Sequence, residues 1–448
     1  MNLEMVRFAN RMTVWQTTKL GRSVRSFGWG FADQMLSSVT NFLLGLLVAR
    51  SVGPGEFGAF GLAYATYTLA LGAARALASE PLVVRFSAGS NDQWGSAVAG
   101  AAGTSIVLGA FVGILSLLVA TVVDEPLRSA FALLGIALPG LLVQDVWRFA
   151  FFALGRGAQA FWNDFVWAVV LFPGAALLLS SGKASMPALM AVWAVAGWTA
   201  AAVGLAQSKV VPRPDRALRW LREQRDLAFR FFGEFVASNG ANQLSLFLIG
   251  GLTTLADLGR LRAGQMILGP LNVLFLGAGL VAVAETKRFL ATSPRKMDEA
   301  VRIVSALLTL GTVSWATVVL LLPATIGEAV MSRNWVGGRA LLVPLAIGAV
   351  GYALSYGAMT GLRALAAARS SLSARMFDAT STVVLGVTGA AVAGIKGAAW
   401  GYAIAGCLRV ANWWWHFHEA RRSASATGGV PARPAAMVVD ATFPNETP

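Results

Sequence analysis

The chain has 448 residues, of which 56% are hydrophobic and 13% charged, and its mean hydropathy is +0.63. A soluble domain carries about 25% charged residues, so this composition excludes an ordinary soluble protein. The net charge of +14 would suggest nucleic-acid binding in a soluble chain, but in a membrane protein basic residues first record topology. The single cysteine, Cys407, excludes an intramolecular disulfide and a zinc cluster.

Long apolar runs, separated by charged or Gly/Pro segments, predict an all-α, polytopic membrane protein. Each run has about the 20 residues that an α-helix needs to cross a bilayer, and none shows the alternating pattern of an outer-membrane barrel. The first run is too long for a signal peptide and is interpreted as a retained helix. Twelve spanning helices are predicted, over residues 28–50, 57–79, 95–122, 127–154, 160–180, 186–206, 231–253, 260–284, 302–323, 340–364, 376–394 and 397–418.

The distribution of Lys and Arg predicts which side of the membrane each loop faces. With the N-terminus placed inside, 24 of the 36 basic residues fall in inner segments, 8 in outer segments and 4 within spans. Cytoplasmic loops carry the excess of basic residues, so this bias predicts an even number of helices and two cytoplasmic termini. It also accounts for most of the net charge, so no nucleic-acid partner is expected.

A polar, arginine-rich connection divides the hydrophobic region into two sets of six helices. Orientation explains its charge, although anionic lipids of the inner leaflet would suit it too. The expected parts are a basic cytoplasmic N-terminus (1–27), an N-lobe (28–206), the cytoplasmic connection (207–230), a C-lobe (231–418) and a disordered cytoplasmic tail (419–448).

The two halves are related by a weak internal repeat with a shift of 201 positions. The shift superimposes the acidic pairs Asp33/Glu234 and Glu56/Asp257. Because each half holds an even number of helices, parallel repeats about the membrane normal are predicted. Identities occur at Phe31/Phe232, Ser37/Ser238, Asn41/Asn242, Leu43/Leu244, Leu47/Leu248 and Gly58/Gly259.

The first helix of each half carries an acid, a serine and an asparagine at intervals of four residues. These are Asp33, Ser37 and Asn41 in the first half and Glu234, Ser238 and Asn242 in the second. The spacing places each set on one helix face. Two interpretations are open: the stripes line a central cavity between the lobes, or they join helices by hydrogen bonds.

Charged residues inside spans are the first candidates for function, because they are costly when they face lipid. Arg75 and Asp33 lie at similar depth and could pair, and Asp145 and Arg148 have the i, i+3 spacing of a helical ion pair. Alternatively, Arg75 and Arg148 could bind an anionic head group, since guanidinium matches phosphate geometry. Gln144, Asn163 and Asp164 also concentrate toward the inner side of the first half.

The sequence contains no P-loop, catalytic triad or metal-ligand cluster. We therefore expect a protein that is not an enzyme and that holds no cofactor or metal, although H⁺ or Na⁺ could couple to its activity.

The segment LLVARSVGPGEFGAFGLA, which starts at Leu46, resembles the first hairpin of bacterial polysaccharide flippases. Ala49, Arg50, Gly53, Pro54, Phe57 and Gly58 carry the match, with Val52 where leucine is usual. Such flippases belong to the multidrug/oligosaccharidyl-lipid/polysaccharide exporter superfamily. The resemblance implies two six-helix lobes around a cavity that opens alternately to each side.

The resemblance also implies a substrate and a location. An oligosaccharide on a polyprenyl diphosphate would move from the inner to the outer leaflet of the bacterial plasma membrane, in contact with the bilayer and with polysaccharide polymerase or ligase machinery. Candidate substrate-binding residues are Arg50, Arg75, Arg148, Asn41 and Asn242, and candidate ion-coupling residues are Asp33, Glu234 and Asp145.

Two alternatives stay open at this point. A multidrug or small-molecule cation antiporter of the same superfamily would share the lobes and the acidic first helix. An integral-membrane enzyme acting on lipid-linked sugars would be expected to expose a sizeable outer loop. The longest outer loop runs only from about Pro323 to Arg339, which disfavours the enzyme.

Overall fold

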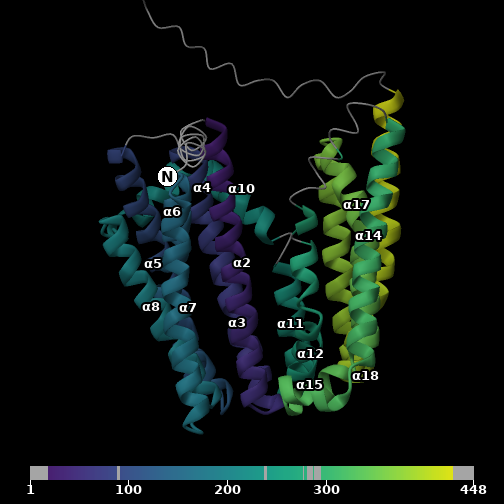
Figure 1. Ribbon diagram of the computed structural model, residues 1–448, viewed down its shortest axis with the longest axis horizontal. Coiled ribbons are helices and arrows are strands. Elements are labelled where there is room, and N and C mark those ends of the chain that lie inside the picture. Colours follow the sequence, from purple (N-terminus) through teal and green to yellow (C-terminus); the bar gives the residue numbers. More distant parts are fainter. Residues whose placement is uncertain are drawn as a thin grey trace, which may run out of the picture. The chain divides into compact units, whose positions relative to one another are not determined.

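The protein is all-helical in the part that its structure, a computed structural model, describes: residues 19–87, 91–236, 240–275, 277–279, 286 and 294–426 (Figure 1). No strand occurs within these residues, so the predicted all-α polytopic fold is confirmed. Nine of the described helices are long and apolar enough to cross a membrane, and one bent pair qualifies as a tenth. Residues 1–18 and 427–448, which include most of the predicted N-terminal segment and tail, lie outside the description.

The helices form two compact units, which are discontinuous in sequence. Unit 1 contains Met1–Gly269, Thr317–Leu345 and Thr382–Tyr402, and unit 2 contains Pro270–Ala316, Ala346–Ser381 and Ala403–Pro448. The elements of the first half of the chain are α2 (Lys19–Ser51), α3 (Pro54–Ala74), η1 (Arg75–Ser79), α4 (Glu80–Phe86), α5 (Asn91–Val122), α6 (Leu127–Ala153), α7 (Gly157–Ser180) and α8 (Met186–Ser208). They are followed by η2 (Pro214–Arg216), α9 (Ala217–Glu223), α10 (Arg225–Phe235), α11 (Ala241–Leu252), α12 (Leu255–Ile267), α14 (Pro294–Leu321), α15 (Ala324–Met331), α16 (Arg333–Arg339), α17 (Leu342–Ala364) and α18 (Ala368–Ala426).

The second predicted helix continues past its expected end through a π-helical turn, η1, into α4. Pro81 has no N–H, so it cannot bond to the Leu77 carbonyl four residues earlier. The Trp220 indole of α9 donates to that carbonyl at 3.1 Å instead. The predicted cytoplasmic connection therefore docks on the π-helical turn that begins at Arg75.

The first hairpin, whose sequence carries the family resemblance, is a packing motif in the structure. Gly53 precedes α3, and its N–H donates to the Glu56 carboxylate at 3.3 Å. A Cβ on Gly58 would lie 1.9 Å from the Leu255 carbonyl oxygen, and a Cβ on Gly259 would lie 1.9 Å from the Pro54 carbonyl oxygen. Only glycine allows the two backbones to come this close. The two contacts correspond to each other under the predicted shift of 201 positions, which superimposes Gly58 on Gly259 and Pro54 on Leu255.

The same end of unit 1 is held by the predicted outer loop, which contains the short helices α15 and α16 (Figure 1). Asn334 of α16 is fully buried, and its amide donates to the carbonyl oxygens of Ala49 at 2.7 Å and Val52 at 2.8 Å. Ala49 lies in the last turn of α2 and Val52 directly follows the helix, so neither carbonyl has a helical partner. The loop thus supplies hydrogen-bond donors to the carbonyl groups at the end of the first helix.

Three helix boundaries differ from the prediction. The helix α12 begins five residues before the expected start at 260, because Thr254 caps it by accepting a hydrogen bond from the Asp257 N–H at 3.1 Å. The helix α18 contains the last two predicted spans, which meet at non-helical backbone at Ala393 and Gly394, where Gly394 has φ +60°. The span predicted over 231–253 is described as α10 and α11, and Ser238 lies outside the described residues between them.

Candidate functional site

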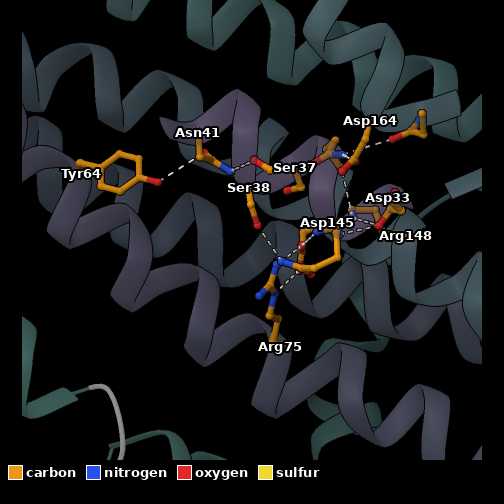
Figure 2. A network of polar contacts seen from close by, with 12 residues as sticks. Asp33, Ser37, Ser38, Asn41, Tyr64, Arg75, Asp145, Arg148 and Asp164 are labelled. Carbon is orange, nitrogen blue, oxygen red and sulfur yellow. Dashed lines mark hydrogen bonds and ion pairs between the residues drawn. The ribbon is translucent and has the colours of Figure 1, made fainter. Parts of the chain in front are cut away.

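A network of buried charges joins four elements of unit 1, with Arg148 of α6 at its centre. The Arg148 guanidinium contacts Asp33 of α2 at 2.6 Å, Asp145 of α6 at 3.3 Å and Asp164 of α7 at 3.2 Å (Figure 2). Arg148, Asp33 and Asp164 side chains are 6%, 0% and 1% exposed. A guanidinium offers five donors in a fixed fork, which suits it to bridge several carboxylates away from water.

The second guanidinium of the network, Arg75, binds one carboxylate through two bonds. Its Nε and Nη2 atoms donate to the two oxygens of Asp145 at 2.8 and 2.7 Å, and it lies 5.5 Å from the centre of the Phe149 ring. Arg75 is the first residue of the π-helical turn, a type of distortion frequent at functional sites. Its side chain is 34% exposed, so Arg75 forms the open rim of an otherwise buried network.

Amide side chains extend the network toward α7 and α8. Gln144 donates to Asp164 at 2.6 Å, and Asn163, which is fully buried, donates to the Ala200 carbonyl at 2.9 Å. Gln144 binds one carboxylate oxygen of Asp164, and Arg148 contacts the other. The concentration of polar groups in the first half that the sequence predicts is therefore one connected structure.

The pairing differs from the predicted one in its partners. The i, i+3 contact between Asp145 and Arg148 is present, but Asp33 contacts Arg148 and not Arg75. Arg75 contacts Asp145 instead. Similar depth placed Asp33 and Arg75 at one level of the bundle, but the rotation of each helix about its axis decides which side chains meet.

The network holds three carboxylates and two guanidiniums. If all five are ionised, it carries one excess negative charge in surroundings where an uncompensated charge is costly. One oxygen of Asp33 is buried and accepts no hydrogen bond within the described residues. One proton on a carboxylate would therefore neutralise the arrangement.

The remaining predicted site residues lie apart from this network. Asn41 accepts a hydrogen bond from the Tyr64 hydroxyl of α3 at 3.3 Å and donates to the Ser37 carbonyl at 2.8 Å (Figure 2). Arg50, at the end of α2, is exposed. Glu234 on α10 and Asn242 on α11 are also exposed. The structure thus joins Asp33, Asp145, Arg75 and Arg148, and it leaves Glu234 and Asn242 of the second stripe exposed.

Arg262, which the count of basic residues assigned to an outer segment, lies in the interior of α12. Because α12 begins at Leu255, Arg262 lies about 10 Å along the helix. Its aliphatic part packs on α3, where a Cβ on Gly61 would be 3.0 Å from the Arg262 Cγ. Its guanidinium donates to Gln265 at 3.4 Å and, within the described residues, forms no ion pair. The capping pattern of Thr254 and Asp257 was the sequence signal that could have revealed it.

No group of three or more His, Cys, Asp or Glu side chains suited to hold a metal ion occurs in the part of the chain that the structure describes. The described site is thus made of charged pairs, amides and phenols.

Comparisons with known proteins place the fold. No protein-family model and no curated protein matches the sequence. Among solved structures, an inward-facing multidrug resistance MATE family transporter of the MOP superfamily superimposes with a TM-score of 0.69 at 12% identity, over 89% of this chain and 100% of the other. The lipid II flippase MurJ in an inward closed conformation superimposes with a TM-score of 0.67 at 14% identity, over 89% of this chain and 91% of the other. A mutant of the Vibrio cholerae MATE transporter VcmN superimposes with a TM-score of 0.54 at 16% identity, over 90% of this chain and 97% of the other.

The chain therefore has the fold of the MATE transporters of the MOP superfamily and of MurJ. It is a multi-pass membrane protein built on a transporter fold.

Proposed function

We propose that this protein is a flippase that moves a polyprenyl-diphosphate-linked oligosaccharide from the inner to the outer leaflet of the bacterial plasma membrane by alternating access. Both termini would lie in the cytoplasm, and the product would supply cell-surface polysaccharide synthesis. The observation that carries the proposal is Arg262, a guanidinium within a predicted span that has no carboxylate partner in the described residues.

An unpaired cation at this depth is expected to face a cavity or a ligand, because lipid would make it costly. Guanidinium binds phosphate oxygens with two parallel hydrogen bonds, so a lipid diphosphate suits Arg262 better than a cationic drug does. Arg75, which is partly exposed, offers a second guanidinium on the same unit. In this structure that guanidinium is bound to Asp145. The similarity in fold to the lipid II flippase MurJ agrees with an anionic glycolipid substrate.

A cation antiporter is the second candidate, and the charge count of the network favours it. Three carboxylates against two guanidiniums leave a site for a proton or Na⁺, and the fold is also that of MATE transporters. In the flippase proposal the same surplus couples ion movement to transport through Asp33, Asp145 and Asp164. The two candidates therefore differ in the charge of the substrate and not in the presence of a coupling ion.

The test is transport by the purified protein in vesicles, across an imposed pH or Na⁺ gradient. A lipid-linked oligosaccharide would be followed by its accessibility to a lectin outside the vesicle, and a fluorescent organic cation by its accumulation. We expect the lipid to move, and Arg262→Gln to slow it about tenfold or more through loss of a charge-assisted hydrogen bond.

Arg260→Gln is the matched control, since Arg260 lies on the same helix but pairs with Asp257 at 2.8 Å and is half exposed. It should transport as the unchanged protein does. Accumulation of the organic cation without movement of the lipid would overturn the flippase proposal, and equal lipid transport by both variants would remove Arg262 from it.

A further inference from the structure

Unit 2 contains a cluster of three aromatic side chains inside a span. Tyr352 and Tyr356 lie one turn apart on α17, and the Phe275 ring contacts both, at centroid distances of 4.8 and 5.9 Å. The Tyr356 hydroxyl donates to the Phe275 carbonyl at 3.0 Å, and this bond orients the Tyr356 ring. Both tyrosines are partly exposed, so the cluster presents ring surface at the edge of its helix bundle.

Arginines of α17 and α18 lie beside this cluster or on the helix face that carries it. Arg409 of α18 lies 5.5 Å from the centre of the Tyr352 ring and forms an ion pair with Asp378 at 2.5 Å. Arg363 follows Tyr352 by eleven residues, which is three turns, so both side chains project from one face of α17. Arg375 precedes Asp378 by three residues on α18, so these two side chains project from one face of that helix.

The charge of this cluster is unbalanced. Among the described side chains on these helix faces, the three guanidiniums of Arg363, Arg375 and Arg409 stand against the one carboxylate of Asp378. Arg363 is exposed and ends α17, whereas Tyr352 lies about 16 Å deeper along the helix. Positively charged side chains therefore lie both at the end of α17 and beside the aromatic surface.

We propose that this cluster is a binding site for the sugar-diphosphate end of an anionic glycolipid. The proposal rests on the flippase function proposed above and names the part of the substrate that unit 2 recognises. The exposed ring faces of Tyr352 and Tyr356 would pack on a sugar ring, since binding sites combine aromatic walls with a few placed polar groups. Arg363 and Arg375 would bind the phosphates, leaving Arg409 with Asp378.

The ring and charge components can be tested separately on the full-length protein in detergent. Two probes are used: N-acetylglucosamine joined by a diphosphate to a short polyprenyl chain, and inorganic diphosphate. Tyr352→Leu removes the aromatic surface, Arg363→Gln removes an exposed charge, and Arg369→Gln is the matched control, an exposed arginine at the start of α18 in the same unit. Thermal unfolding verifies that each variant is folded.

We expect Arg363→Gln to weaken binding of both probes about tenfold, and Tyr352→Leu to weaken only the sugar-bearing probe, because inorganic diphosphate has no ring to pack. Arg369→Gln should leave both affinities unchanged. Unchanged affinity in folded Arg363→Gln and Tyr352→Leu proteins would overturn the site, as would an equal loss in the Arg369→Gln control.

The vesicle assay keeps this result distinct from the proposed function. Lipid transport that is unaffected by Tyr352→Leu and Arg363→Gln would leave the flippase standing and overturn the site. Binding that depends on both residues in a protein that moves no lipid would support the site and overturn the flippase.

Discussion

The two units use the same ion pair, arginine with aspartate, in opposite ways. In unit 1, Arg148 and Arg75 serve three aspartates, and apart from Arg75 the charged side chains are at most 6% exposed. In unit 2, the Arg409 and Asp378 side chains are 16% and 15% exposed, and Arg363 and Arg375 lie on the helix faces that carry Tyr352 and Asp378. The first site has a surplus of negative charge and the second a surplus of positive charge. In the proposals made above, the first would take up the coupling ion and the second the anionic end of the substrate.

Loss of Arg148 should have the largest effect on stability. Arg148→Ala would leave Asp33 without its ion pair and Asp164 without a cation, both in buried positions. Breaking a buried pair on one side costs roughly 3–5 kcal/mol, so little folded protein should survive detergent extraction. The measurement is thermal unfolding followed by size-exclusion chromatography. Stability equal to that of the unchanged protein would show that the network does not hold the four elements together.

Loss of Arg409 should have a smaller effect, because its partner is less buried. We expect Arg409→Ala to cost about 1–3 kcal/mol, the penalty of leaving a polar group unsatisfied. The double variant with Asp378→Asn should recover part of this loss, since no unpaired charge then remains. A loss as large as that of Arg148→Ala would contradict the difference in burial between the units.

The smallest effect is expected at the surface pair of Arg85 and Asp226. The side chains are 36% and 52% exposed, and Arg85 donates to both carboxylate oxygens at 2.7 and 2.6 Å. Desolvation raises the pKa of Asp226, but the hydrogen bonds from Arg85 outweigh this effect. The pKa of Asp226 is therefore lowered below its ordinary 3.8. The contribution to stability is therefore present above pH 3.8 and is lost as the pH falls through the lowered value.

Asp226→Asn should accordingly leave thermal unfolding at pH 7 almost unchanged, because an exposed ion pair is screened by solvent. Its unfolding temperature should also change less than that of the unchanged protein when the pH is lowered from 5 to 3. A strong destabilisation at neutral pH would mean that this pair holds the cytoplasmic connection in place.

Apolar runs and spacing predicted most of the fold and part of the site. They placed the helices and the Asp145/Arg148 pair, because hydrophobic length and i, i+3 spacing are local properties. The exchange of partners between Asp33 and Arg75 could not be predicted, since it depends on helix rotation and on the π-helical turn that begins at Arg75. Arg262 was counted with the outer segments because it lies two residues from the predicted start at 260, whereas the Thr254 cap starts the helix at Leu255 and places Arg262 about two turns inside it.

The crossing of Gly58 and Gly259 has a consequence for how unit 1 responds to its surroundings. The two helices meet through backbone atoms, at points that carry no side chain. Such a junction has no group to titrate, no counter-ion to lose and no rotamer to select, so its strength depends on separation alone. Changes of acidity or ionic strength that alter the charges of the buried network would leave this junction as it is, and a single added methyl group would force it apart.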